Sequence, residues 1–130
     1  MIVLDTHIWY WWINLEHDKL SSNILTVIEQ ADELAISAVS CLEITWLVKK
    51  KSLLLPCALS DWFDYAIDQS GLISLPVTRE IAMLSGQLPE HHKDPLDRII
   101  IATTLLHSAK LISVDGKFPL YEELNGCLVF

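Results

Sequence analysis

Five short apolar runs recur along the chain, separated by longer mixed segments. Each run is three or four residues long and contains Ile, Val or Leu. Short apolar runs bounded by polar or turn residues are typical of fully buried strands. The predicted strands are Met1 to Leu4, Leu34 to Ile36, Leu72 to Leu75, Lys110 to Ser113 and Cys127 to Val129.

The segments between these runs have helical character. The segment that begins at Ser21, for example, has a typical capping residue followed by apolar positions from Ile24 to Ile28 at the spacing of one helix face. Short buried strands that alternate with helices predict βαβ units, and therefore an α/β fold with a mainly parallel sheet covered on both faces. The predicted helices are Thr6 to Asn14, Ser21 to Asp32, Val39 to Lys51, Leu59 to Gln69, Thr78 to Ser85 and Asp94 to Ser108.

The composition fits one compact domain over residues 1–130. Hydrophobic residues make up 52% of the chain and the mean hydropathy is +0.36, which excludes a disordered protein. Apolar runs such as Ile99 to Leu106 are far shorter than the roughly 18 to 20 residues of a membrane helix. The N-terminus lacks the basic segment of a secretory signal, so a cytoplasmic protein is expected. Because no CxxC pair is present, we expect reduced, buried thiols at Cys41, Cys57 and Cys127.

The formal charge of −8, from 17 acidic and nine basic residues, limits the kinds of partner. A protein of this charge does not bind nucleic acid through bulk positive potential. The charge is compatible with acids that hold cations, or with a basic partner. The only basic run, Lys49 to Lys51, falls at the end of a predicted helix, where lysines favour the helix dipole; a contact with substrate is the alternative.

Polar residues follow the predicted strands at their carboxyl ends, where open parallel sheets bind ligands. The predicted helix that begins near Asp94 runs antiparallel to the strand after it, which brings Asp97 to the same edge of the sheet. The strand-end residues are Asp5 after the first strand, Ser37, Ser40 and Glu43 after the second, and Ser113 and Asp115 after the fourth.

Each of these acids has a purely structural explanation when taken alone. Asp94 before Pro95 is a typical helix cap. Ser40 and Glu43 match the S-x-x-E capping box. Asp5 could cap the helix that begins near Thr6.

The combination of four acids at one edge is harder to explain by capping. Carboxylates that lie close together repel one another, so they either hold protons or bind a cation. Carboxylate oxygens without clustered cysteines suit Mg²⁺ or Mn²⁺ better than zinc. The sequence therefore predicts a metal site formed by Asp5, Glu43, Asp97 and Asp115.

Four sequence blocks carry a resemblance to a known family. They are LDTHIWYWW, ISAVSCLEI, LPEHHKDPLDRIIIATT and LISVDGKF, and they extend over nearly the whole chain. In this order and spacing they resemble the PIN-domain ribonucleases, specifically VapC-type toxins of bacterial toxin–antitoxin pairs. Leu96 stands where relatives often have Phe, and Ser113 where Thr is common; both exchanges keep the chemical character. The acids of the family match Asp5, Glu43, Asp97 and Asp115.

The resemblance implies a three-layer α/β/α sandwich with a doubly wound sheet, and Mg²⁺-dependent hydrolysis of RNA phosphodiester bonds by a metal-activated water. It also implies homodimers and inhibition by a small antitoxin. We expect Asp5 and Asp97 to bind Mg²⁺ directly, and Glu43 and Asp115 to bind it through water or to hold a second ion. Asp94 is assigned to capping. Residues that could orient these ligands or contact the substrate are Thr6, Ser37, Ser113 and Arg98.

The histidines and aromatic residues lie outside the predicted set of metal ligands. No H-x-x-x-H or cysteine pattern supports metal binding by histidine, although His7 or His92 could orient a ligand or contact RNA. Trp9 and Trp12 can share one helix face with the core. Tyr10 and Trp11 then point elsewhere, and we expect them at an interface with a second copy or with the antitoxin, joined by Trp46.

Two other classes of function share parts of this pattern. A phosphotransfer protein also places an Asp after its first parallel strand. The haloacid-dehalogenase type requires D-x-D, however, and His7 occupies the second acidic position. A receiver would show an acidic pair after the first strand, which is absent. A non-catalytic module that keeps the fold is the remaining alternative, and metal binding without RNA cleavage would support it.

Overall fold

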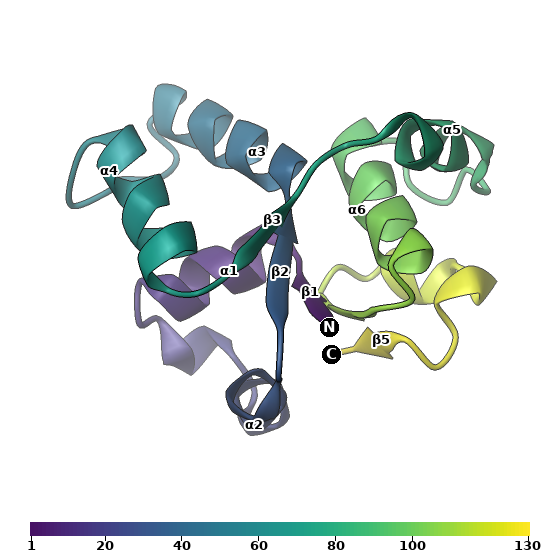
Figure 1. Ribbon diagram of the computed structural model, residues 1–130, viewed down its shortest axis with the longest axis horizontal. Helices are drawn as coiled ribbons and strands as arrows, with labels where there is room; N and C mark the ends of the chain where they lie inside the picture. Colours follow the sequence, from purple (N-terminus) through teal and green to yellow (C-terminus); the bar gives the residue numbers. More distant parts are fainter.

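The computed structural model describes all 130 residues and contains one five-stranded sheet (Figure 1). The strand order is β3-β2-β1-β4-β5, and every neighbouring pair is parallel. This confirms the predicted parallel sheet. The strands are β1 (Ile2–Leu4), β2 (Leu34–Ser37), β3 (Ile73–Leu75), β4 (Lys110–Ile112) and β5 (Leu128–Val129).

Helices fill the segments between the strands, as the sequence predicts. The longest two have 12 residues, and no helix combines the length and apolar character needed to cross a membrane. The α-helices are α1 (Thr6–Ile13), α2 (Ser22–Gln30), α3 (Ala38–Lys49), α4 (Leu59–Phe63), α5 (Arg79–Gln87) and α6 (Pro95–Leu106). The remaining helical segments are the π-helix η2 (Asp64–Gln69) and the 3-10 turns η1 (His17–Lys19), η3 (Phe118–Leu120) and η4 (Glu122–Leu124).

Successive residues of each inner strand point into different cores, because side chains alternate across a sheet. In β1, Val3 packs in the core beside α5 and α6, whereas Leu4 packs in the core beside α1, α2 and α4. The other inner strands, β2 and β4, divide their residues in the same way. Figure 1 shows the sheet between these two sets of helices. The fold is therefore the expected three-layer α/β/α sandwich.

Helix α6 is the apolar helix whose N-terminus carries Asp94 and Asp97. The Asp94 side chain caps it by accepting a hydrogen bond from the Leu96 amide at 2.9 Å, and Pro95 occupies the first turn. Ile100 and Ile101 are fully buried against the sheet. The helix ends at Leu106, shortly before Ser108 adopts a positive φ of 49°. Burial along its length fixes the position of its acidic N-terminal turn.

The order of the strands reverses between β1 and β4, which lie side by side at the centre of the sheet. The chain leaves β1 toward β2 and β3, and then crosses back to β4 on the other side. In open α/β sheets a crevice forms at the carboxyl ends of the strands at such a point. The residues that follow β1 and β4, Asp5 and Ser113, flank this position.

Three details differ from the sequence predictions. The prediction that Ser40 and Glu43 form a capping box is wrong, because α3 begins earlier, at Ala38. Its cap is Ser37, whose hydroxyl accepts a hydrogen bond from the Val39 amide at 3.2 Å. The predicted helix over residues 59–69 changes at Asp64 from α to π geometry. All three cysteines are free, but none is fully buried: Cys57 is exposed, and Cys41 and Cys127 are partly buried.

Candidate active site

Four carboxylates from four separate elements line one cleft of about 380 Å³ at the carboxyl edge of the sheet. Asp5 follows β1, Glu43 lies in the second turn of α3, Asp97 lies in the first turn of α6 and Asp115 follows β4. The structure thus brings together the four acids that the sequence singled out. His7, Trp11 and Val114 complete the lining.

Asp5 is held by hydrogen bonds on both carboxylate oxygens. Its Oδ1 accepts from the Thr6 amide at 2.8 Å, and its Oδ2 accepts from the Ser113 hydroxyl at 2.7 Å. Burial raises the pKa of Asp5 above the ordinary value, while these two hydrogen bonds act in the opposite direction. The bonds fix the carboxylate, and its remaining lone pairs stay available to a ligand.

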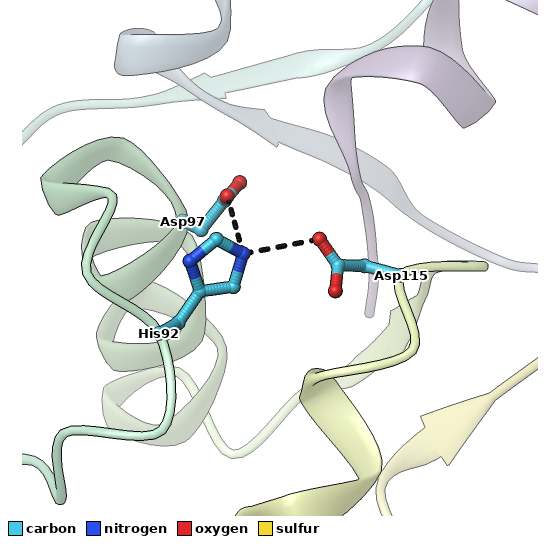
Figure 2. A group of neighbouring side chains, drawn as sticks. All are labelled: His92, Asp97 and Asp115. Atoms are coloured by element: carbon cyan, nitrogen blue, oxygen red, sulfur yellow. Dashed lines mark hydrogen bonds and ion pairs between the residues drawn. The ribbon is translucent and has the colours of Figure 1, made fainter.

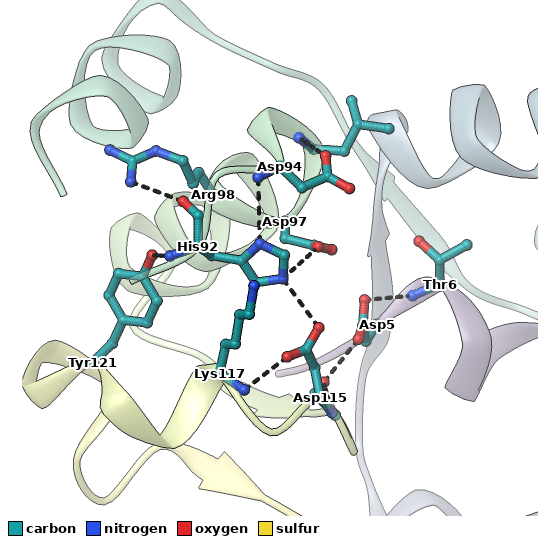
Figure 3. Close-up of polar contacts among 11 residues, drawn as sticks. Asp5, Thr6, His92, Asp94, Asp97, Arg98, Asp115, Lys117 and Tyr121 are labelled. Carbon is teal, nitrogen blue, oxygen red and sulfur yellow. Dashed lines mark hydrogen bonds and ion pairs between the residues drawn. The ribbon is translucent and has the colours of Figure 1, made fainter. Parts of the chain in front are cut away.

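The imidazole ring of His92 lies between Asp97 and Asp115 and contacts both carboxylates (Figure 2). Nε2 of His92 lies 2.9 Å from Asp97 Oδ2 and 3.1 Å from Asp115 Oδ2. Nδ1 of the same ring accepts a hydrogen bond from the Asp94 amide at 3.3 Å, as Figure 3 shows. In neutral His92 the proton is therefore on Nε2, which can donate to only one of the two carboxylates at a time.

No Lys or Arg side chain lines the cleft to offset the charges of the four acids. Burial, together with the charges of Asp5, Asp94, Glu43 and Asp115, raises the pKa of Asp97 to about 8. Oε1 of Glu43 is buried and has no hydrogen-bond partner. A buried acceptor without a partner and an acid that keeps its proton at neutral pH are the features that a bound cation relieves.

The donor set fits a hard divalent cation. Asp5, Glu43, Asp97 and Asp115 all offer oxygen, the ligand that such ions prefer, and no cysteine lies in the cleft. Ligand atoms of His92, Asp97 and Asp115 also lie within 4.8 Å of one another. The imidazole was not expected among the candidate ligands.

The chain is similar to a known protein family along most of its length. A family model described as PIN domain matches residues 2–124. This chain belongs to the PIN domain family. It is 32% identical over 117 residues to Ribonuclease VapC22 of Mycobacterium tuberculosis, a match that covers 89% of this chain and 88% of that protein. The family predicted from the four sequence blocks is confirmed.

Solved structures share the fold of this PIN domain. The VapBC2 structure from Rickettsia felis, bound to a DNA fragment from its promoter, matches with a TM-score of 0.70 at 20% identity, covering 99% of this chain and 98% of that one. A toxin–antitoxin complex from Klebsiella pneumoniae matches with a TM-score of 0.66 at 21% identity, covering 100% and 97%. At this level of identity the similarity shows a common fold.

The hydroxyl residues predicted to support the PIN-domain acids differ in their positions. Ser113 donates to Asp5 and accepts from the Asp115 amide at 3.1 Å, so it links two of the acids. The Thr6 hydroxyl donates to Ser40 at 2.9 Å, which ties α1 to α3. Ser37 is fully buried as the cap of α3 and does not line the cleft.

Arg98 anchors the loop before α6. Its guanidinium donates to the backbone carbonyls of Leu88, Pro89 and His92 at 2.8, 2.9 and 3.3 Å. It is not among the residues that line the acidic cleft. The structure therefore shows Arg98 holding the His92 loop in place, whereas the sequence offered it as a phosphate contact.

Two residues lie closer to the acids of this PIN domain than the sequence predicts. The sequence offers His92 only as a secondary contact, because adjacent histidines give no metal-ligand spacing; its position five residues before Asp97, across a helix cap, is the available signal. Trp11 was assigned to an interface, but it lines the cleft. Its position on the first helix after Asp5 was the available signal.

Proposed function

We propose that this PIN domain is a Mg²⁺-dependent endoribonuclease and the toxin of a toxin–antitoxin pair. The observation that carries the proposal is the convergence of four carboxylates at one sheet edge, with the pKa of Asp97 raised to about 8 and a Glu43 oxygen left without a partner. The similarity to Ribonuclease VapC22 supports RNA as the substrate and hydrolysis as the reaction. Mn²⁺ has the same ligand preferences and is the alternative ion.

Asp5, Glu43, Asp97 and Asp115 would hold the cation. Bound Mg²⁺ supplies a Lewis acid that polarises the phosphate, offsets charge on the leaving oxygen and lowers the pKa of a water. The residues of the chain prepare the site before substrate arrives.

Each part of this preparation has a structural basis. Ser113 and the Thr6 amide keep the Asp5 carboxylate oriented and favour its ionised form. His92 keeps Asp97 and Asp115 close together. The lining of the cleft contains no Ser, Cys or Lys side chain, which favours attack by water over a covalent intermediate on the protein.

The proposed partners follow from the relatives. The similar structures include VapBC2 and a toxin–antitoxin complex, which supports a small cognate antitoxin for this chain. We also propose a homodimer, as the family resemblance implies. Because the proposed substrate is cellular RNA, we place the activity in the cytoplasm.

The direct test measures cleavage of RNA by purified wild type, Asp5→Asn and Asp97→Asn with Mg²⁺ or with a chelator. The wild type should cleave only with the metal, and both variants should lose most of the activity while remaining folded. Asp32→Asn is the matched control, because Asp32 is exposed and lies before β2 at the opposite edge of the sheet. Undiminished Mg²⁺-dependent cleavage by Asp5→Asn would contradict the proposal.

A cellular test addresses the partner. Wild type and Asp5→Asn are induced in a bacterium, and growth and RNA fragments are compared. Growth arrest by the wild type alone, relieved by a protein encoded next to it, supports both the activity and the antitoxin. Metal binding without RNA cleavage in vitro would favour the non-catalytic module.

A further inference from the structure

The wall of the cleft beside the acids is aromatic. Trp11 lines the cleft from α1, one helical turn after His7, and the centroids of the two rings are 5.7 Å apart. The Lys19 ammonium lies 5.7 Å from the centre of the Trp11 ring. Val114, which is 52% exposed, adds apolar surface to the same cleft.

Trp11 packs against the edge of the core, whereas its neighbour Trp9 lies inside it. Trp9 is fully buried, stacks on Phe63 and packs with a tilted ring against Trp62. Tyr10 also packs beside Trp62, with ring centroids 6.2 Å apart. The Trp11 indole is only partly buried, and it is the only Trp, Tyr or Phe that lines the acidic cleft.

The charge of the cleft makes such a surface significant for RNA binding. Four carboxylates repel a phosphodiester backbone, and the whole chain carries −8. A bound cation offsets the repulsion only locally. Affinity for the rest of a nucleotide must then come from contacts that do not depend on positive charge, and stacking of a base on an aromatic ring is the main contact of this kind.

We propose that Trp11 forms a stacking subsite for an unpaired nucleobase next to the scissile phosphate. The Lys19 ammonium, which pairs with Glu16 at 3.0 Å, lies over the Trp11 ring at the border of the subsite, and Val114 contacts the edge of the base. A base inside a duplex cannot lie against the indole, so the subsite selects single-stranded or loop RNA. This inference rests on the proposed ribonuclease function and specifies the form of its substrate.

The test combines a protein variant with a substrate variant. Trp11→Ala should lower kcat/KM for a short single-stranded ribooligonucleotide by about 5- to 150-fold, the range for loss of one stacked base, mainly by raising KM. In the wild type, an abasic site at one position beside the cleaved bond should cause a similar loss. The same abasic site should cause no further loss in Trp11→Ala, because the two changes remove one interaction.

Two variants separate stacking from general damage to the fold. Trp11→Phe keeps an aromatic face and should retain most of the wild-type activity. Tyr65→Ala is the matched control, since Tyr65 is an aromatic residue that is 49% exposed on η2 and does not line the acidic cleft. It should cleave like the wild type.

A binding measurement distinguishes failure of this inference from failure of the proposed function. Fluorescence anisotropy of labelled single-stranded RNA is recorded for wild type and Trp11→Ala with Ca²⁺ in place of Mg²⁺. If the wild type binds in a Trp11-dependent manner but never cleaves RNA, the subsite stands and the ribonuclease proposal falls. If Trp11→Ala matches the wild type in both cleavage and binding, or alters only self-association or binding to another protein, the stacking subsite is overturned.

Discussion

Replacing Asp97 with Asn should make the metal-free protein more stable at pH 8. The folded state holds the Asp97 proton with a pKa of about 8, against an ordinary value of 3.8. Between these two pH values the folded state binds more protons than the unfolded state, so stability falls as pH rises through this window. Well below pH 3.8 both states are protonated and the effect disappears. Asn carries no charge and removes the dependence.

The magnitude follows from the two pKa values. Each pKa unit between the folded and unfolded states corresponds to about 1.4 kcal/mol, which gives an upper limit of about 6 kcal/mol above pH 8. The Asp97 side chain is 14% exposed, so solvent screens its charge. Screening of this kind reduces the effect, and we expect a gain of about 2 to 3 kcal/mol for Asp97→Asn.

Urea denaturation of both proteins at pH 4.5 and pH 8.5, in the presence of a chelator, measures this difference. Asp97→Asn should match the wild type at the lower pH and exceed it at the higher. Added Mg²⁺ should then stabilise the wild type but not the variant, because a ligand stabilises only the state that binds it. An Asp97→Asn protein that is less stable at pH 8.5, or that keeps the wild-type dependence on pH, would refute the account of the acidic cluster.

Three further changes test the supports of the site and the core. Ser113→Ala removes a hydrogen bond from Asp5, raises the pKa of that acid further and should weaken Mn²⁺ binding by about tenfold in a calorimetric titration. Asp94→Ala removes the cap of α6 and should be about 1 kcal/mol less stable in urea denaturation than Asp94→Asn, which removes the same charge but keeps a capping side chain. Ile100→Ala opens a cavity at a fully buried position and should lower the free energy of unfolding by about 2 to 5 kcal/mol. Leu54→Ala, at a residue that is 84% exposed, should change it by no more than about 0.5 kcal/mol, and equal effects of the two variants would contradict the assigned core.

The sheet could be predicted from the sequence because its three inner strands, β1, β2 and β4, are largely buried on both faces, whereas the edge strand β3 is partly exposed. A buried strand of this kind is a short apolar run, and all five runs became strands within one residue at either end. The start of α3 was harder to predict than the strands, because Ser37 and Ser40 can both cap a helix. In the structure Ser37 caps α3, and the Ser40 hydroxyl instead accepts a hydrogen bond from Thr6, which is far away in the sequence.

The gathering of the acids could also be predicted, since the carboxyl ends of parallel strands and the N-termini of the helices that run antiparallel to them lie at the same edge of the sheet. The roles of His92 and Arg98 could not be predicted in the same way. His92 reaches the acids through a loop whose course is fixed by three carbonyl contacts to Arg98 and by the Tyr121 hydroxyl. Loop conformations of this kind arise from tertiary contacts that no periodicity in the sequence reveals.

The cleft draws its acids from almost the full span of the chain, from Asp5 to Asp115. During synthesis, a ribosome that has made β1, α3 and even α6 has produced a polypeptide with an incomplete set of carboxylates. β4, which must insert beside β1 to bring Ser113 against Asp5, is itself a late segment. The proposed metal site is therefore complete only when translation is nearly finished.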